Sequence, residues 1–151
     1  MELLESHAPI ASITVMVQQE VADRMLATPG DRECGAITLA VAYYAETVLV
    51  AHVPPHCFSP RPHVDSAVIR LDILDVPPVQ TNDDQLMFRL IRAAFGERRK
   101  TLVNAIANSP ELSFSKEEVA RVIQEAGLDP TVRGEKLDLA VYAQLADAFS
   151  R

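Results

Sequence analysis

The chain has 151 residues, of which 48% are hydrophobic and 23% charged, and it contains 10 prolines, 5 glycines and no tryptophan. That composition is typical of a soluble globular protein, and no apolar run approaches the roughly 18 residues that a membrane span needs. The acidic opening MELLESHAP disfavours a signal peptide and two cysteines cannot build a disulfide framework, so we expect a reducing, cytoplasmic location. The net charge of −7 argues against attraction of the whole molecule to nucleic acid or to an anionic membrane.

The first half of the chain predicts an α/β arrangement with an unfinished sheet. Apolar, β-branched runs predict strands, and apolar residues at helical spacing predict helices. We expect strands at 13–18, 47–53 and 64–74, helices at 20–27 and 35–45, and the tail of a helix at 1–6. Three apolar strands need neighbours at both edges and cover on both faces, which two helices cannot supply. We therefore expect part of a larger sheet, with an exposed edge through which the chain self-associates.

The second half is predicted to be helical throughout, beyond a proline-containing boundary at residues 76–78. Ser115 begins the pattern of a capping box, and Gly127 stands where a left-handed residue closes a helix. The chain is thus predicted to contain an α/β part at residues 1–76 and a small all-helical domain at residues 80–151. We expect its helices at 83–95, 97–108, 115–126 and 135–149.

A proline-rich segment, PPHCFSPRPH at residues 54–63, separates the second and third predicted strands. Four prolines in ten residues remove amide donors and restrict φ, so we expect a stiff, extended surface loop rather than a helix or strand. Phe58 is the one aromatic residue in this loop. Its ring can be a hydrophobic plug for the loop or a platform on which an unpaired base stacks.

Several residues with reactive or metal-binding side chains surround this loop. A zinc site needs three or four converging ligands, and the spacing here matches no standard zinc motif, so we expect no metal. A nucleophilic pair of Cys57 with a histidine would lack a defined third member. The glycines form no G-x-G-x-x-G motif or phosphate-binding loop, so the chain carries no recognisable nucleotide site. The reactive cluster, within fourteen residues, is His52, His56, Cys57, His63 and Asp65.

Basic residues are concentrated in the second half, where residues 80–151 hold 10 of the 14 lysines and arginines. Five of them lie close together, with Glu97 as the one acid among them. Such a run is either a solvated helix face or a phosphate-contacting patch, because affinity for a polyanion depends on local cations more than on total charge. The run consists of Arg89, Arg92, Arg98, Arg99 and Lys100.

Four segments resemble the C-terminal part of the bacterial ribosomal RNA small-subunit adenine dimethyltransferases. They are MVQQEVADRM (16–25), VPPHCFSPRPHVDSAVIRL (53–71), FRLIRAAFGERRKTLVNAI (88–106) and VRGEKLDLAVYAQLADAF (132–149). The resemblance implies the last three strands of a Rossmann-like methyltransferase sheet followed by a small all-helical domain. It also implies S-adenosylmethionine-dependent N6-dimethylation of two adjacent adenosines in small-subunit rRNA.

The resemblance also assigns residue roles. Phe58 begins an F-x-P-x-P-x-V-x-S pattern and resembles the ring that stacks on the target adenine, while Gln18 and Glu20 are expected to be structural. Cys34 stands where the family usually has an aromatic residue before a glycine, and we expect only a local change in packing. The substrate loop then includes Ser59, Pro60 and Pro62, and the RNA-facing surface includes Arg89, Arg92, Arg98, Arg99 and Lys100.

The family's glycine-rich cofactor motif, its ribose-binding acids and its Asn-Leu-Pro-Tyr tetrapeptide have no counterpart in this chain, and MELLES resembles the stretch just after that tetrapeptide. We therefore expect the chain to start inside a catalytic domain, to bind no S-adenosylmethionine alone and to be inactive alone. Two other interpretations stay open. The chain is either a non-enzymatic RNA- or ribosome-binding module, or a helical interaction domain attached to a sheet fragment. In the enzyme-fragment interpretation and in the RNA- or ribosome-binding interpretation, the partner is the small ribosomal subunit.

Overall fold

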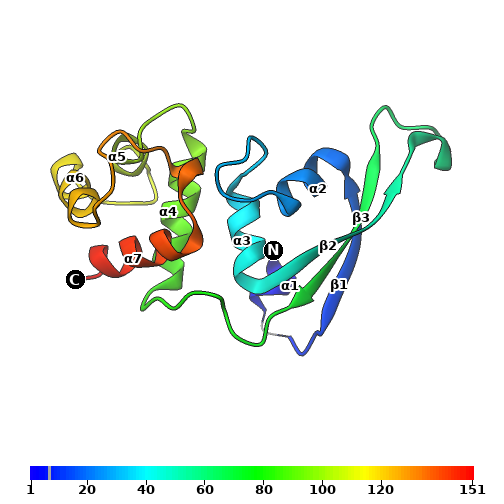
Figure 1. Ribbon diagram of the computed structural model, residues 1–151, viewed down its shortest axis with the longest axis horizontal. Coiled ribbons are helices and arrows are strands. Elements are labelled where there is room, and N and C mark those ends of the chain that lie inside the picture. The colour runs from blue at the N-terminus through cyan, green and yellow to red at the C-terminus, as the bar shows by residue number, and fades with distance from the viewer. Residues whose placement is uncertain (7) are drawn as a thin grey trace. The chain divides into compact units, whose positions relative to one another are not determined.

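The computed structural model describes residues 1–6 and 8–151, which divide into two units (Figure 1). Unit 1 comprises Met1–Thr28 and Arg32–Pro78, and unit 2 comprises Pro29–Asp31 and Val79–Arg151. The predicted fold class, an α/β part followed by an all-helical part, is confirmed. Unit 1 contains α1 (Glu2–Glu5), β1 (Ser12–Gln18), α2 (Gln19–Leu26), α3 (Ala36–Tyr44), β2 (Ala45–Val53), the 3₁₀ turn η1 (Pro55–Cys57) and β3 (Ser66–Ile73). Unit 2 contains α4 (Asp84–Gly96), α5 (Leu102–Ala107), α6 (Lys116–Glu125), the 3₁₀ turn η2 (Gly134–Lys136) and α7 (Leu139–Phe149).

The sheet of unit 1 is antiparallel, and its strand order is β1-β3-β2. β3 lies in the centre, where Ile69 pairs with Val15 of β1 on one side and with Leu49 of β2 on the other. A register shift between Leu49 and Ala51 interrupts the pairing of β2 with β3. The apolar, β-branched runs of the sequence therefore form strands, and the last of them becomes the central strand.

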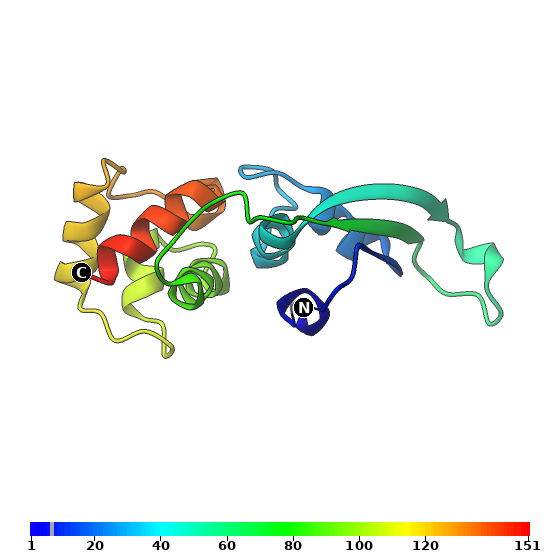
Figure 2. The ribbon, with the colours of Figure 1, turned by 90° about the horizontal axis from the view of Figure 1, so that it is seen from below.

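One face of this sheet is covered by α2 and α3 (Figure 2). On that face the β3 side chains Ala67, Ile69 and Leu71 are fully buried against the two helices. On the opposite face Met16 of β1 and Val48 of β2 are 53% and 38% exposed. Large apolar side chains are thus exposed on this face of the sheet.

The helices of unit 2 begin at polar capping residues. The Asp83 carboxylate accepts the Leu86 N–H at 2.8 Å, and the Ser115 hydroxyl accepts the Glu118 N–H at 3.2 Å. Gly127 closes α6 with a φ of +73°, as the sequence predicted, because glycine adopts this left-handed conformation without a Cβ penalty. In the described part of the chain, no helix has the length and apolarity required to cross a membrane.

Two predicted helix boundaries are wrong. The helix expected at 97–108 begins only at Leu102, because the Thr101 hydroxyl caps it by accepting the Asn104 N–H, and residues 97–100 form a turn instead. The helix expected at 135–149 begins at Leu139 after the Asp138 cap. Both corrections leave basic residues on turns rather than on a helix face.

The Asp147 carboxylate of α7 holds the segment that precedes α4. Its Oδ1 accepts hydrogen bonds from the Asn82 N–H and from the Thr81 hydroxyl, each at 2.8 Å, and these two bonds lower the pKa of Asp147 below 3.8. Because the folded-state pKa is lowered, the stabilisation is present at neutral pH and is lost as pH falls through that pKa. We expect Asp147→Asn to lower the melting temperature at pH 7 and to have a progressively smaller effect as the pH falls through the lowered pKa of Asp147, which thermal unfolding over a pH series checks.

Candidate nucleic-acid interface

The proline-rich loop projects from the end of the sheet, away from α2 and α3 (Figure 1). Its base is tied to all three strands through Asp65, which lies directly before β3. The Asp65 carboxylate pairs with His52 Nε2 of β2 at 2.9 Å, and the Asp65 carbonyl accepts the Gln19 N–H, directly after β1, at 2.9 Å. These contacts hold the ends of the loop on the rigid part of unit 1.

Phe58 directly follows the turn η1 in this loop. The sequence predicted an extended loop, but this prediction is wrong for part of it. Pro55–Cys57 winds into η1, because the fixed φ of proline suits such a turn. The Phe58 N–H donates to the Pro55 carbonyl at 3.2 Å, and its side chain is half-buried. Phe58 is therefore neither fully buried nor fully exposed, and part of the residue is accessible to solvent. The other predicted loop residues follow directly, with Ser59 and Pro60 exposed and Pro62 half-buried.

The histidines and cysteine of this region do not converge. His52 pairs with Asp65, whereas His56, Cys57 and His63 are exposed on the loop. No group of three or more His, Cys, Asp or Glu side chains among the described residues could hold a metal ion. We therefore assign these residues to the loop and its base.

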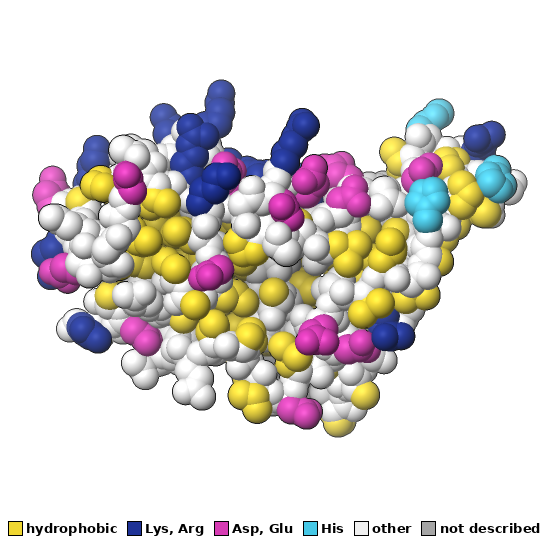
Figure 3. Space-filling model, in the orientation of Figure 1, with side chains coloured by type: hydrophobic (Ala, Val, Ile, Leu, Met, Phe, Trp, Pro, Cys, Tyr) yellow, Lys and Arg dark blue, Asp and Glu magenta, His cyan; other side chains and the backbone are white. Residues whose placement is uncertain are grey.

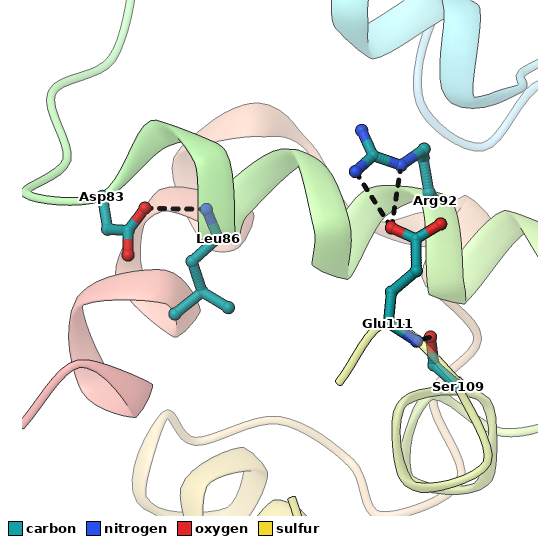
Figure 4. A network of polar contacts seen from close by, with 5 residues as sticks. All are labelled: Asp83, Leu86, Arg92, Ser109 and Glu111. Atoms are coloured by element: carbon teal, nitrogen blue, oxygen red, sulfur yellow. Dashed lines mark hydrogen bonds and ion pairs between the residues drawn. The ribbon is translucent and has the colours of Figure 1, made fainter. Parts of the chain in front are cut away.

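The predicted basic run is divided between a helix and a turn. Arg89 and Arg92 lie on α4, and the Arg92 guanidinium forms two hydrogen bonds with Glu111 Oε2, at 3.0 and 3.2 Å (Figure 4). Arg99 and Lys100 lie on the turn after α4, are exposed, and form no ion pair with the described residues. Arg92 is therefore exposed but partly neutralised by Glu111, whereas Arg99 and Lys100 have no such acidic partner among the described residues.

A second basic segment, remote in sequence, lies beside this turn. The Leu102 N–H donates to the Val132 carbonyl at 2.7 Å, and Arg98 Nε lies 3.4 Å from Glu135 Oε2. Residues 131–137 therefore lie against the turn and add two exposed cations that the sequence did not single out. Only their tertiary position links these cations to the run. They are Arg133 and Lys136.

We name Arg98, Arg99, Lys100, Arg133 and Lys136 the basic surface. Lys and Arg side chains gather over this part of unit 2, with few acids among them (Figure 3). Cations on a rigid turn contact successive phosphates of a nucleic acid and release its bound counterions. The surface can therefore attract a polyanion locally although the chain carries a net charge of −7.

Three further residues named from the sequence lie in or beside the secondary-structure elements of unit 1. Gln18 ends β1, and Glu20 pairs with Arg24 one turn further along α2. Cys34 is fully buried, so the thiol is part of the packing before α3.

The amino-acid sequence of the whole chain is similar to those of known proteins. A family model described as ribosomal RNA adenine dimethylase matches residues 1–150. The ribosomal RNA small subunit methyltransferase A of Lachnoclostridium phytofermentans is 54% identical over 147 residues, which are 97% of this chain and 51% of that protein. The protein of the same name from Geobacillus thermodenitrificans is 46% identical over 150 residues, or 99% of this chain and 51% of its own length. The chain thus spans about half the length of these curated relatives.

Two solved structures share the fold. A dimethyladenosine transferase from Plasmodium falciparum matches with a TM-score of 0.72 and 23% identity, over 94% of this chain and 58% of the other. The 23S rRNA methyltransferase ErmE matches with a TM-score of 0.60 and 19% identity, over 96% of this chain and 57% of the other. The chain therefore shares its fold with parts of these two structures.

Proposed function

Because the chain belongs to the ribosomal RNA adenine dimethylase family, we propose that it supplies the base-holding loop and the RNA-contacting surface for the N6-dimethylation of two adjacent adenosines in small-subunit rRNA. Unit 1 carries the loop with Phe58, and unit 2 carries the basic surface. The small ribosomal subunit is its partner, which implies a cytoplasmic location. The family match over residues 1–150, together with the Phe58 loop, is the observation that carries this proposal.

Phe58 would hold the target adenine. An enzyme that acts on the N6 amine must take the adenine out of its stack, and an aromatic ring compensates for the lost stacking by about 1–3 kcal/mol. The Phe58 N–H donates to the Pro55 carbonyl, and the neighbouring prolines restrict the backbone, which limits the conformational freedom lost when the ring meets a base. Holding the amine in place is a large part of such a reaction, because orientation converts an encounter in solution into one within a complex.

We also propose that this chain alone does not hold S-adenosylmethionine, the methyl donor of the family. A nucleoside cofactor is usually cradled by glycines whose backbone is open to the ligand. The five glycines of this chain stand singly, at positions 30, 35, 96, 127 and 134, and form no glycine-rich loop. We therefore assign the donor to no residue of this chain and propose that the chain alone transfers no methyl group. Turnover by the chain alone on undermethylated small subunits would contradict this assignment.

A fluorescent base tests the role of Phe58. With 2-aminopurine in place of a target adenine in an rRNA hairpin, we expect the wild-type chain to quench the fluorescence as it binds. Phe58→Ala should abolish the quenching and weaken binding about tenfold, which corresponds to the loss of one stacking contact. Phe58→Tyr is the matched control, since it keeps the ring, and it should retain most of both effects.

The same experiment separates this proposal from a non-enzymatic ribosome-binding module. That second candidate is favoured by one observation, namely that the basic surface lies wholly in unit 2 and needs nothing from the loop. A binding module would bind the hairpin equally well with Phe58→Ala and would not quench 2-aminopurine. This result would overturn the proposed role of the loop.

A further inference from the structure

One acid, Glu135, lies among the cations of the basic surface. It stands in η2 between Arg133 and Lys136, and its side chain is 24% exposed, whereas that of its partner Arg98 is 42% exposed. A carboxylate beside cations lowers the local positive potential, so on charge alone Glu135 should weaken the binding of a polyanion. Its contacts indicate a second effect with the opposite sign.

The backbone that carries Glu135 is fixed on both sides within unit 2. The buried Tyr142 hydroxyl donates to the Gly134 carbonyl at 2.9 Å. The Gly30 N–H, which belongs to the Pro29–Asp31 segment of the same unit, donates to the Glu135 carbonyl at 2.9 Å. Because η2 is held in this way, the Glu135 carboxylate is a fixed point to which a neighbouring segment can be tied.

The segment tied to it is the turn at residues 97–100. Near the beginning of the turn, Arg98 Nε lies 3.4 Å from Glu135 Oε2. Directly after the turn, the Leu102 N–H donates to the Val132 carbonyl at 2.7 Å. The backbone bond fixes one end of the turn beside residues 131–137, and the ion pair fixes the other end.

We propose that Glu135 is a positioning residue for RNA binding, which holds Arg98 so that the turn at residues 97–100 keeps its place beside η2. This inference rests on the proposed function of the basic surface. Cations that are already arranged contact successive phosphates with a smaller loss of conformational freedom than cations that must first be ordered. The gain from this arrangement exceeds the repulsion between the Glu135 carboxylate and the RNA.

Neutral substitutions of two acids separate positioning from charge. Glu135→Gln keeps the size of the side chain and removes its charge, and we expect it to weaken binding of an rRNA hairpin about threefold at 0.1 M salt, because an exposed ion pair holds its geometry only modestly. Glu97→Gln is the matched control on the same turn, since the Glu97 carboxylate forms no ion pair within the described residues. It removes the same charge and should strengthen binding. Fluorescence anisotropy measures both.

Two further variants show whether Glu135 acts through Arg98. Glu135→Asp keeps the charge but draws it away from Arg98, so it should also weaken binding. In an Arg98→Gln background, Glu135→Gln should instead strengthen binding, because only its charge effect remains. A general loss of stability in unit 2 would weaken binding in both backgrounds, so this reversal of sign is specific to positioning. Circular dichroism during thermal unfolding checks that each variant is folded at the temperature of the binding measurement.

Several results would overturn the role of Glu135. Stronger or unchanged binding by Glu135→Gln would show that the acid only neutralises the surface. Equal weakening with and without Arg98 would place its effect in the stability of unit 2. The proposed function fails in a different way, because the double variant Arg99→Glu and Lys100→Glu would then bind the hairpin as well as the wild type. That result would overturn both proposals, whereas the first two overturn only the positioning role.

Discussion

Gly134→Ala is expected to destabilise unit 2 by about 3 kcal/mol, at the upper end of the usual cost of overpacking a core. A Cβ built at Gly134 would overlap the Ala94 Cβ of α4 and lie 2.6 Å from the Tyr142 hydroxyl of α7. That hydroxyl donates to the Gly134 carbonyl at 2.9 Å, so the displacement would also break a buried hydrogen bond. The measurement is urea unfolding followed by circular dichroism.

Gly96→Ala is the control for this substitution. Gly96 is exposed at the end of α4, and a Cβ there would meet nothing within 4 Å. Because alanine favours the helix by up to about 1 kcal/mol over glycine, we expect no loss of stability. Equal effects of the two substitutions would show that the tight packing around Gly134 is not what excludes a side chain there.

Reversing two charges of the basic surface, with Arg99→Glu and Lys100→Glu together, is expected to weaken binding of an rRNA hairpin by about tenfold to a hundredfold at 0.1 M salt. Both side chains are exposed on the turn after α4 and form no ion pair within the described residues, so they are available to phosphates. The neutral pair Arg99→Gln and Lys100→Gln should reduce the salt dependence of binding by roughly one phosphate contact for each residue. Fluorescence anisotropy over a series of salt concentrations measures both effects.

A second double variant with the same change in net charge, placed away from the basic surface, shows whether the position of the charges matters. Lys116→Glu together with Arg121→Glu changes the net charge by the same amount, but on α6, where Arg121 already pairs with Glu125. We expect a much smaller loss of affinity than for the turn variant. If both pairs weaken binding equally, the effect reflects net charge and not the basic surface.

Local sequence patterns predicted most of the secondary structure. The strands expected at 13–18, 47–53 and 64–74 occur at 12–18, 45–53 and 66–73, because short β-branched runs bounded by prolines and polar residues leave few alternatives. The helix starts near 97 and 135 were wrong, because helical spacing continues through residues that Thr101 and Asp138 exclude by capping. Capping residues inside an apolar pattern are the signal that would have corrected both.

The sequence by itself determined the fold class, the family resemblance, the proline-rich loop around Phe58 and one basic run, since each depends on residues that are near neighbours in the chain. Only the tertiary structure showed that Arg133 and Lys136 join Arg98–Lys100, because the Leu102–Val132 and Arg98–Glu135 contacts connect segments far apart in sequence. It also showed which cations have an acidic partner, since Arg92 is paired with Glu111 and Arg98 with Glu135. Likewise, the apolar strands were predictable, but the central place of β3 depends on its pairing with both β1 and β2.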